Sequence, residues 1–207
     1  MPISAALFDF GGVILTSPFE AFSRYERDNG LPSGFLRTVN AADPDTNAWA
    51  RLERSEIDLE DFDEAFAAES ESLGHRVAGS DVLGLLMGDV RPEMVGAVRR
   101  CGERLATGLL TNNVVGLAAT ADPAISEVLD LFDVVIESSR VGVRKPDPEF
   151  YEIACAQLSI SPDEAVFLDD LGINLKPARS MGMTTIKVDD PAVAIAELET
   201  VVGFPLR

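Results

Sequence analysis

The first indication of the fold class of this 207-residue chain is residues 3–13, Ile-Ser-Ala-Ala-Leu-Phe-Asp-Phe-Gly-Gly-Val. The apolar run Ile3–Phe8 is typical of a short buried strand, and Asp9 and the pair Gly11-Gly12 indicate a tight turn directly after it. Four similar runs follow along the chain, at Leu105–Leu110, Phe132–Ile136, Ala165–Leu168 and Thr184–Val188. The sequence therefore predicts five short buried strands.

Helical patterns separate these strands, at Pro92–Gly102, Val114–Leu131, Pro148–Leu158, Leu175–Gly182 and Ala192–Val201. A regular alternation of strands and helices implies parallel strand pairing with right-handed crossover connections. Pro92, Pro148 and Pro191 stand near predicted helix starts, where the missing backbone donor costs nothing. We expect an α/β fold, with a parallel sheet of about five strands flanked by helices.

Residues 16–90 break the alternation, because they contain amphipathic helical stretches but no convincing buried strand. They hold 16 acidic residues and six arginines, so they carry −10 of the net charge of −18. We interpret this stretch as an all-helical insert. The predicted division is an α/β core formed by residues 1–15 and 91–207, with residues 16–90 inserted as a separate helical unit.

The overall charge and the rare residue types narrow the function classes. With 17 Lys and Arg against 35 Asp and Glu, the chain lacks the positive surface that binding to nucleic acid or to anionic membranes requires. No apolar run reaches the roughly 18 residues of a membrane span, and we expect a cytoplasmic, unprocessed chain without a membrane partner. One histidine, His75, and two cysteines without metal-site spacing exclude clustered His or Cys ligands. Carboxylates are therefore the candidate reactive groups.

Polar residues gather where the predicted strands end, at the edge of the sheet where parallel α/β folds bind their ligands. Asp9 follows the first strand, Thr111-Asn112-Asn113 follow the second, and Asp169-Asp170 follow the fourth. Lys145 lies in a loop between the third and fourth strands. A carboxylate, a hydroxyl, an ammonium and a carboxylate pair are the groups that an aspartyl-phosphate mechanism needs.

These residues occur in four segments whose order resembles the haloacid dehalogenase superfamily: Asp9-Phe10-Gly11-Gly12-Val13, Leu110-Thr111-Asn112, Arg144-Lys145-Pro146-Asp147 and Phe167-Leu168-Asp169-Asp170. Residues 109–113 and 169–177 are most similar to the N-terminal phosphatase domain of soluble epoxide hydrolases. The resemblance implies a Rossmann-like core, with residues 16–90 as a helical cap that closes over the site. It also implies hydrolysis of a small-molecule phosphate ester; it leaves the substrate and the oligomeric state open.

The resemblance further assigns a role to each matching residue. Asp9 would attack phosphorus, Thr111 would bind the phosphoryl oxygens, and Lys145 would neutralise charge. Mg²⁺ would be held by Asp9, the carbonyl of Gly11 and Asp170, with Asp169 supporting this metal site. Asn112, with Gly12 and Asn113 beside the phosphate, would contribute to substrate binding.

Gly11 departs from the pattern, because most phosphatases of the superfamily carry a second aspartate there as general acid and base. Such proton transfer contributes typically about 10² to 10⁴ in rate. The first interpretation is a phosphatase whose leaving group departs without protonation, so that rates fall steeply with rising leaving-group pKa, or one assisted by a carboxylate of the cap. The second is metal-free dehalogenation with Arg24 or Arg51 as an anion clamp, in which the Asp169-Asp170 pair has little purpose. The third is a phosphate-binding module without turnover.

Overall fold

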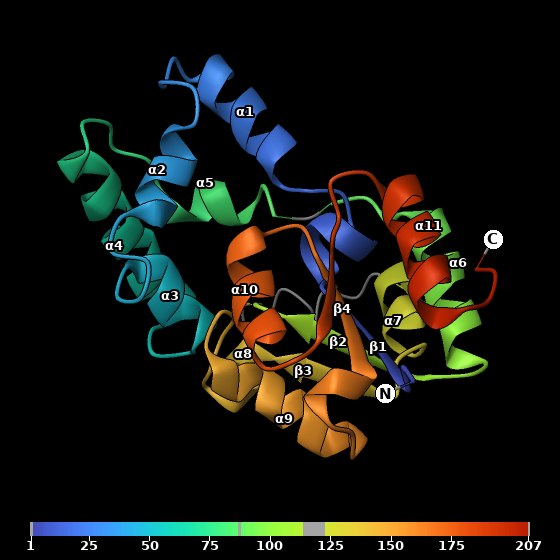
Figure 1. The fold of residues 1–207 in the computed structure, drawn as a ribbon. Coiled ribbons are helices and arrows are strands. Elements are labelled where there is room, and N and C mark those ends of the chain that lie inside the picture. Colours follow the sequence, from blue (N-terminus) through green and yellow to red (C-terminus); the bar gives the residue numbers. More distant parts are fainter. Residues whose placement is uncertain (1, 87, 114–122, 207) are drawn as a thin grey trace.

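The computed structural model describes residues 2–86, 88–113 and 123–206 (Figure 1). Its centre is a five-stranded sheet in the order β3-β2-β1-β4-β5, and every strand pair is parallel. The strands are β1 (Ala5–Phe8), β2 (Ala106–Thr111), β3 (Val134–Glu137), β4 (Ala165–Asp169) and β5 (Thr184–Lys187). All five predicted strands are present, within two residues at each end, and the predicted α/β class is confirmed.

The register of the sheet brings distant parts of the chain to one edge. β1 lies in the middle, where Phe8 is paired with Leu109 of β2 on one side and with Leu168 of β4 on the other. Because the strands are parallel, the residues that follow these three positions all emerge at the carboxyl edge of the sheet. Asp9 is therefore a neighbour of the ends of β2 and β4.

Helices cover both faces of the sheet (Figure 1). On one face, the apolar side chains of β1, β2 and β4 pack against α6 (Pro92–Gly102), α7 (Pro123–Leu129) and α11 (Pro191–Val202). The other face packs against α9 (Pro148–Leu158) and α10 (Gly172–Ser180), with the single turn α8 (Ser138–Val141) beside them and a short 3₁₀ turn, Pro162–Glu164, before β4. Burial of both sheet faces explains why the strands are apolar without alternation.

The helix predictions hold with two differences. The predicted helix Val114–Leu131 is present as α7 from Pro123, and residues 114–122 lie outside the described residues. α10 begins at Gly172 rather than at Leu175, because the carbonyl of Leu171 accepts hydrogen bonds from the N–H groups of Asn174 and Leu175. Helical geometry therefore starts almost directly after Asp170.

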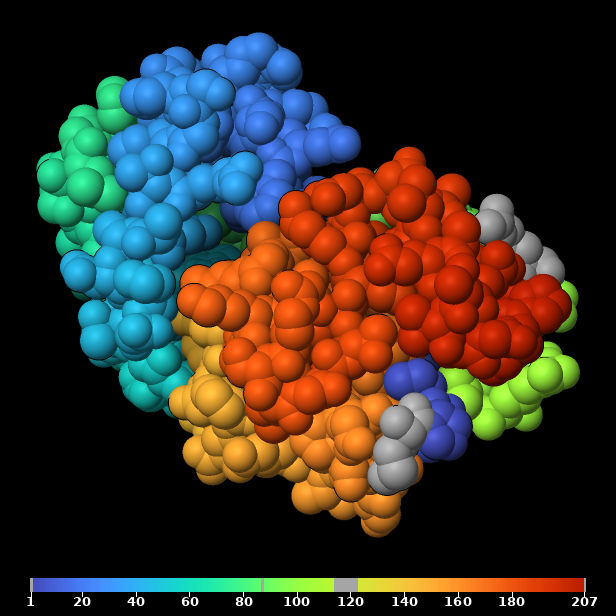
Figure 2. Space-filling model, in the orientation of Figure 1, coloured from blue at the N-terminus to red at the C-terminus, as the bar shows by residue number. Residues whose placement is uncertain are grey.

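Between β1 and α6, the described residues form a short turn at Phe10–Ile14 and then five α-helices: α1 (Phe19–Asp28), α2 (Phe35–Ala41), α3 (Ala48–Glu53), α4 (Leu59–Ser72) and α5 (Gly79–Leu83). They share a hydrophobic cluster of their own, in which Trp49 packs against Phe62 and Phe66. Asp58 caps the first turn of α4 by accepting hydrogen bonds from the N–H groups of Glu60 and Asp61. Figure 2 shows this helical insert as a lobe beside the rest of the molecule.

An antiparallel bridge between Leu15 and Val90 joins the two ends of this insert. Among the described residues, no helix has the length and apolar character that a membrane crossing requires.

Candidate active site

Three carboxylates meet at the carboxyl edge of the sheet. Asp9 follows β1, Asp169 ends β4 and Asp170 comes next, and each offers an oxygen atom within 4.8 Å of the oxygens offered by the other two. Asp9 and Asp169 are buried, and Asp170 is partly exposed. Carboxylates this close repel one another, so a cation is needed to hold them together in the ionised form.

Lys145 supplies one such cation from within the protein. Its side chain is only 1% exposed, and its Nζ lies 2.7 Å from Asp9 Oδ1 and 2.8 Å from Asp169 Oδ2. Burial lowers the pKa of Lys145, but Asp169 and Asp9 more than offset this effect and hold the pKa above its usual value. The ammonium therefore stays charged between the two carboxylates.

One positive charge does not balance three negative ones, and the carboxyl pKa values reflect this. Burial raises the pKa of Asp9 well above its ordinary value; Lys145 opposes the rise, and Asp169 and Asp170 add to it. Burial, followed by the charge of Asp169, raises the pKa of Asp170 to about 6. A second cation at this edge would relieve both effects, because it favours the ionised carboxylates.

Asp169 is fixed in place by several donors. Its Oδ1 accepts a hydrogen bond from the N–H of Leu171 at 2.8 Å, and the Nδ2 of Asn174 reaches both carboxylate oxygens, at 3.1 and 3.0 Å. Together with Lys145, these bonds occupy both oxygens of Asp169. Asp169 therefore orients Lys145, whereas Asp9 and Asp170 are better placed to contact a metal ion.

Gly12 packs directly against Asp170. It has a φ of +76°, and a Cβ atom built on it would lie 2.3 Å from Asp170 Oδ2. Only glycine combines this backbone conformation with so close an approach. By contrast, Gly11 has a φ of −67°, and a Cβ atom there would meet no atom within 4 Å.

The three residues after Leu110 have different surroundings. Thr111 is buried at the end of β2, and among the described residues its hydroxyl makes no hydrogen bond. Asn112 exchanges two hydrogen bonds with the backbone of Lys145, both at 2.9 Å. The Nδ2 of Asn113 donates a hydrogen bond to Glu137 Oε1 at 2.5 Å, and its Oδ1 accepts one from Ser139 Oγ at 2.8 Å. Asn112 therefore fixes the Lys145 loop, and its predicted substrate contact, like that of Asn113, stays a prediction.

The structure adds residues to which sequence reasoning gave no role. Asn174 holds Asp169, and Arg91 donates from Nη1 to the carbonyl of Gly12 at 3.0 Å. Arg144 links the Lys145 loop to the helical insert, because its Nη1 donates to the carbonyl of Pro44 at 3.1 Å and its Nε lies 2.9 Å from Glu53 Oε2. Asn174 lies five residues after Asp169, in the first turn of α10, and this short spacing is a usable signal. The partners of Arg144 and Arg91 leave no trace in the sequence.

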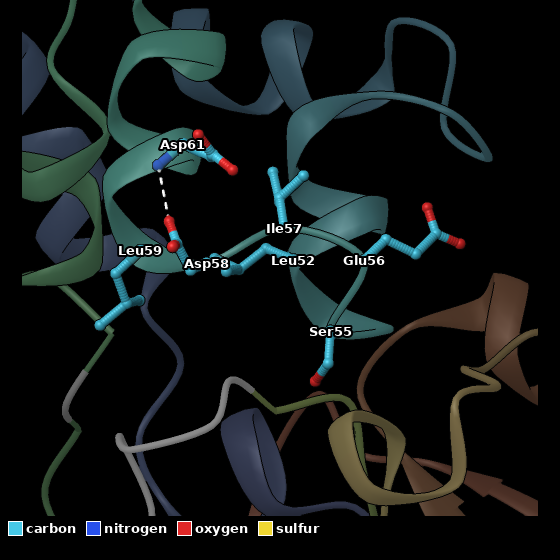
Figure 3. Close-up of a pocket in the computed structure, with 7 residues that line it drawn as sticks. All are labelled: Leu52, Ser55, Glu56, Ile57, Asp58, Leu59 and Asp61. Carbon is cyan, nitrogen blue, oxygen red and sulfur yellow. Dashed lines mark hydrogen bonds between the residues drawn. The ribbon is translucent and has the colours of Figure 1, made fainter.

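A pocket of about 490 Å³ lies in the helical insert between the end of α3 and the start of α4 (Figure 3). Its lining residues are Leu52, Ser55, Glu56, Ile57, Asp58, Leu59 and Asp61. None of the predicted site residues lines it, so this pocket is distinct from the carboxylate cluster. Ser55 also donates to the carbonyl of Ser139 at 2.9 Å, which joins this part of the insert to α8.

A protein-family model described as haloacid dehalogenase-like hydrolase matches residues 3–182. The chain belongs to this family. The match includes all four sequence segments that carry the candidate site, together with the helical insert.

Several known proteins are similar to this chain over nearly its whole length. Acyl-CoA dehydrogenase family member 10 of Mus musculus is 38% identical over 98% of this chain and 19% of that protein. Bifunctional epoxide hydrolase 2 of Mus musculus is 32% identical over 99% of this chain and 40% of its own length. The chain thus spans less than half of these two relatives. Phosphatase MT3486 of Mycobacterium tuberculosis is 31% identical over 91% of this chain and 88% of its own.

Among solved structures, a HAD-family enzyme of Bacteroides thetaiotaomicron in complex with magnesium and inorganic phosphate superimposes with a TM-score of 0.64. It is 22% identical, and the match covers 89% of this chain and 93% of that one. At this identity the likeness supports the shared fold.

Proposed function

We propose that this haloacid dehalogenase-like hydrolase is a Mg²⁺-dependent phosphatase that hydrolyses small-molecule phosphate esters through an aspartyl-phosphate at Asp9. The observation that carries the proposal is the position of Asp9, buried at the carboxyl edge between the ammonium of Lys145 and the carboxylate of Asp170. The phosphatase among the relatives and the magnesium and phosphate in the similar structure agree with this chemistry.

The donor set fits a magnesium ion. Mg²⁺ prefers oxygen ligands and usually binds through one or two carboxylates while it keeps several waters. Asp9, Asp170 and the carbonyl of Gly11 would hold it, with Asp169 behind them, and the absence of a side chain at Gly12 gives Asp170 its room. The ion supplies electrostatic stabilisation of the charge on the transferring phosphoryl group.

In the proposed reaction, Asp9 is the nucleophile and an oxygen of its carboxylate forms the bond to phosphorus. Lys145, held between Asp9 and Asp169, neutralises charge on the phosphoryl oxygens without any movement of the ammonium. The hydroxyl of Thr111, which makes no hydrogen bond to any described residue, is available to donate to a phosphoryl oxygen. Asn112 keeps the Lys145 loop in register with Thr111 through its two backbone hydrogen bonds.

We further propose that residues 16–90 act as a cap on a core formed by residues 1–15 and 91–207. Support comes from the separate hydrophobic cluster of the insert and from its contacts with the core through Arg144 and Ser139. Because Gly11 has no carboxyl, Asp9 and its immediate neighbours suit esters whose leaving group departs readily. Poorer leaving groups require a proton donor from outside this set of residues.

The test is a screen of phosphate monoesters, with inorganic phosphate release measured in Mg²⁺ and in a chelator. We expect turnover that needs Mg²⁺ and that is abolished in Asp9→Asn, a variant of nearly the same size. Equal, vanishing rates in both proteins together with phosphate binding would favour a binding module instead. Halide release from 2-haloacids in the presence of chelator would indicate metal-free dehalogenation.

A further inference from the structure

The proposed phosphatase reaction lacks an evident proton donor for its leaving group. Of the three clustered carboxylates, Asp9 is the nucleophile, Asp170 is a proposed metal ligand, and both oxygens of Asp169 are occupied. Gly11 contributes only backbone, and His75 packs against the ring of Phe35 in the insert. An alkoxide leaving group therefore needs an acid from another part of the molecule.

Glu53 is a buried carboxyl that the helical insert brings to this edge. It is the last residue of α3, it is 6% exposed, and it faces Arg144 in the loop that carries Lys145. Its Oε2 lies 2.9 Å from Arg144 Nε, but the N–H of that nitrogen is directed at the carbonyl of Lys145, at 3.3 Å. Among the described residues, Oε2 thus accepts no well-directed hydrogen bond although it is buried.

The surroundings of Glu53 suit a carboxyl that exchanges a proton. Burial raises its pKa, opposed by the charges of Arg144, Lys145 and Arg54 and by the amide of Asn112. Arg144, which lies 2.9 Å from Glu53, directly precedes Lys145, so Glu53 lies beside the loop whose ammonium is proposed to bind the phosphoryl group. In-line attack by Asp9 from the sheet pushes the leaving oxygen away from Asp9. We take the insert, which contacts the Lys145 loop through Glu53 and α8 through Ser55, as the side toward which this oxygen departs.

The other buried carboxylate in the described part of the insert has a different task. Glu26 accepts hydrogen bonds from the N–H groups of Gly34 and Leu36, at 2.7 and 2.9 Å, and so fixes the start of α2. Glu26 is therefore satisfied within the insert, whereas Glu53 meets the core.

We propose, on the basis of the phosphatase function above, that Glu53 is the proton donor to the leaving group. As Asp9 forms its bond to phosphorus, the P–O bond of the ester breaks and the leaving oxygen takes the electron pair and the proton of the Glu53 carboxyl. In the second step, the Glu53 carboxylate accepts a proton from the water that attacks the aspartyl-phosphate. That attack releases inorganic phosphate and the Asp9 carboxylate, and it returns Glu53 to its protonated form.

The experiment compares two substrates in Mg²⁺, 4-nitrophenyl phosphate, whose phenolate leaves without a proton, and an alkyl phosphate, whose alkoxide needs one. In Glu53→Gln, which is nearly isosteric, we expect kcat for the alkyl phosphate to fall about 10²- to 10⁴-fold, and kcat for 4-nitrophenyl phosphate to change only a few-fold. Adding Gly11→Asp to this variant should restore alkyl phosphate hydrolysis, because a Cβ atom at that position meets no atom within 4 Å and the new carboxyl would lie two residues after Asp9.

The outcomes separate the two proposals. An equal fall in kcat with both substrates would make Glu53 a structural link to Arg144 and would overturn its role as proton donor. No change in kcat with either substrate would overturn that role as well. Failure of the parent protein to hydrolyse 4-nitrophenyl phosphate in an Asp9-dependent manner would instead overturn the phosphatase function itself. Circular dichroism of each variant establishes that it is folded. If Glu53→Gln does not fold, Glu53→Asp replaces it, because aspartate keeps the acid but withdraws it by one methylene. Its kcat must still fall more with the alkyl phosphate than with 4-nitrophenyl phosphate.

Discussion

Replacement of Gly12 by alanine tests how closely the turn after β1 is matched to Asp170. Alanine at a φ of +76° carries a left-handed backbone penalty of about 1–2 kcal/mol in the free energy of unfolding. The new Cβ atom would also lie 2.3 Å from Asp170 Oδ2 and 2.4 Å from its Cγ. Because these are atoms of a side chain that can rotate, we expect the overlap to displace the Asp170 carboxylate rather than to unfold the protein.

The displacement should appear in metal binding. Loss of a supporting contact at a metal site typically lowers metal affinity about 10–100-fold. Because Asp170 is a proposed ligand itself, we expect Gly12→Ala to lower the Mg²⁺ affinity by about 100-fold or more. Isothermal titration with Mg²⁺ measures the affinity, and urea unfolding in a chelator measures the stability.

Gly11→Ala is the matched control for this experiment. It adds the same methyl group one residue earlier, at a φ of −67° with no atom within 4 Å. A methyl group at a compatible glycine position stabilises a protein by about 0.4–1 kcal/mol, through the unfolded chain. If the two variants have the same stability and the same Mg²⁺ affinity, then Gly12 is not shaped around Asp170 and the reasoning is refuted.

Three further predictions concern the charges and the burial around the site. Lys145→Met leaves two buried carboxylates without their cation, so the free energy of unfolding, measured in a chelator, should fall by about 3–5 kcal/mol. The control Lys176→Met, at an exposed position of α10, should change the free energy of unfolding by less than about 0.5 kcal/mol. In urea unfolding, Mg²⁺ at 100 times its Kd should stabilise the parent by about 2.7 kcal/mol and should have much less effect on Asp170→Asn, and equal stabilisation of both would contradict the proposed ligand. Burial raises the pKa of the Cys101 thiol from 9.0 to about 12, so the thiol ionises in the unfolded chain first; its contribution to stability is complete below pH 9 and is lost as the pH rises toward 12. Between these pH values, the parent should therefore lose more unfolding free energy than Cys101→Ala, and parallel pH profiles would show that Cys101 makes no such contribution.

Much of the candidate site could be predicted from the sequence because it follows from strand topology. Asp9 and the pair Asp169-Asp170 each come directly after a short apolar run, and parallel strands place such residues at one edge. Their proximity therefore required only that β1 and β4 be neighbours, and the two strands are paired in the sheet. The turn residues Gly11 and Gly12 could be recognised as a turn, but nothing in the sequence indicated which of them is crowded and which is free.

Local periodicity and composition are enough to predict the alternation of buried strands and helices, the helical character of residues 16–90 and the residue types available for chemistry. Which side chains pair across the chain is visible only in the folded protein. Asn112 fastens the Lys145 loop, Asn174 holds Asp169, and Glu53 faces Arg144 from another part of the molecule. Such contacts arise when helices dock, and docking depends on the summed shape of packed apolar surfaces, which no short stretch of sequence encodes.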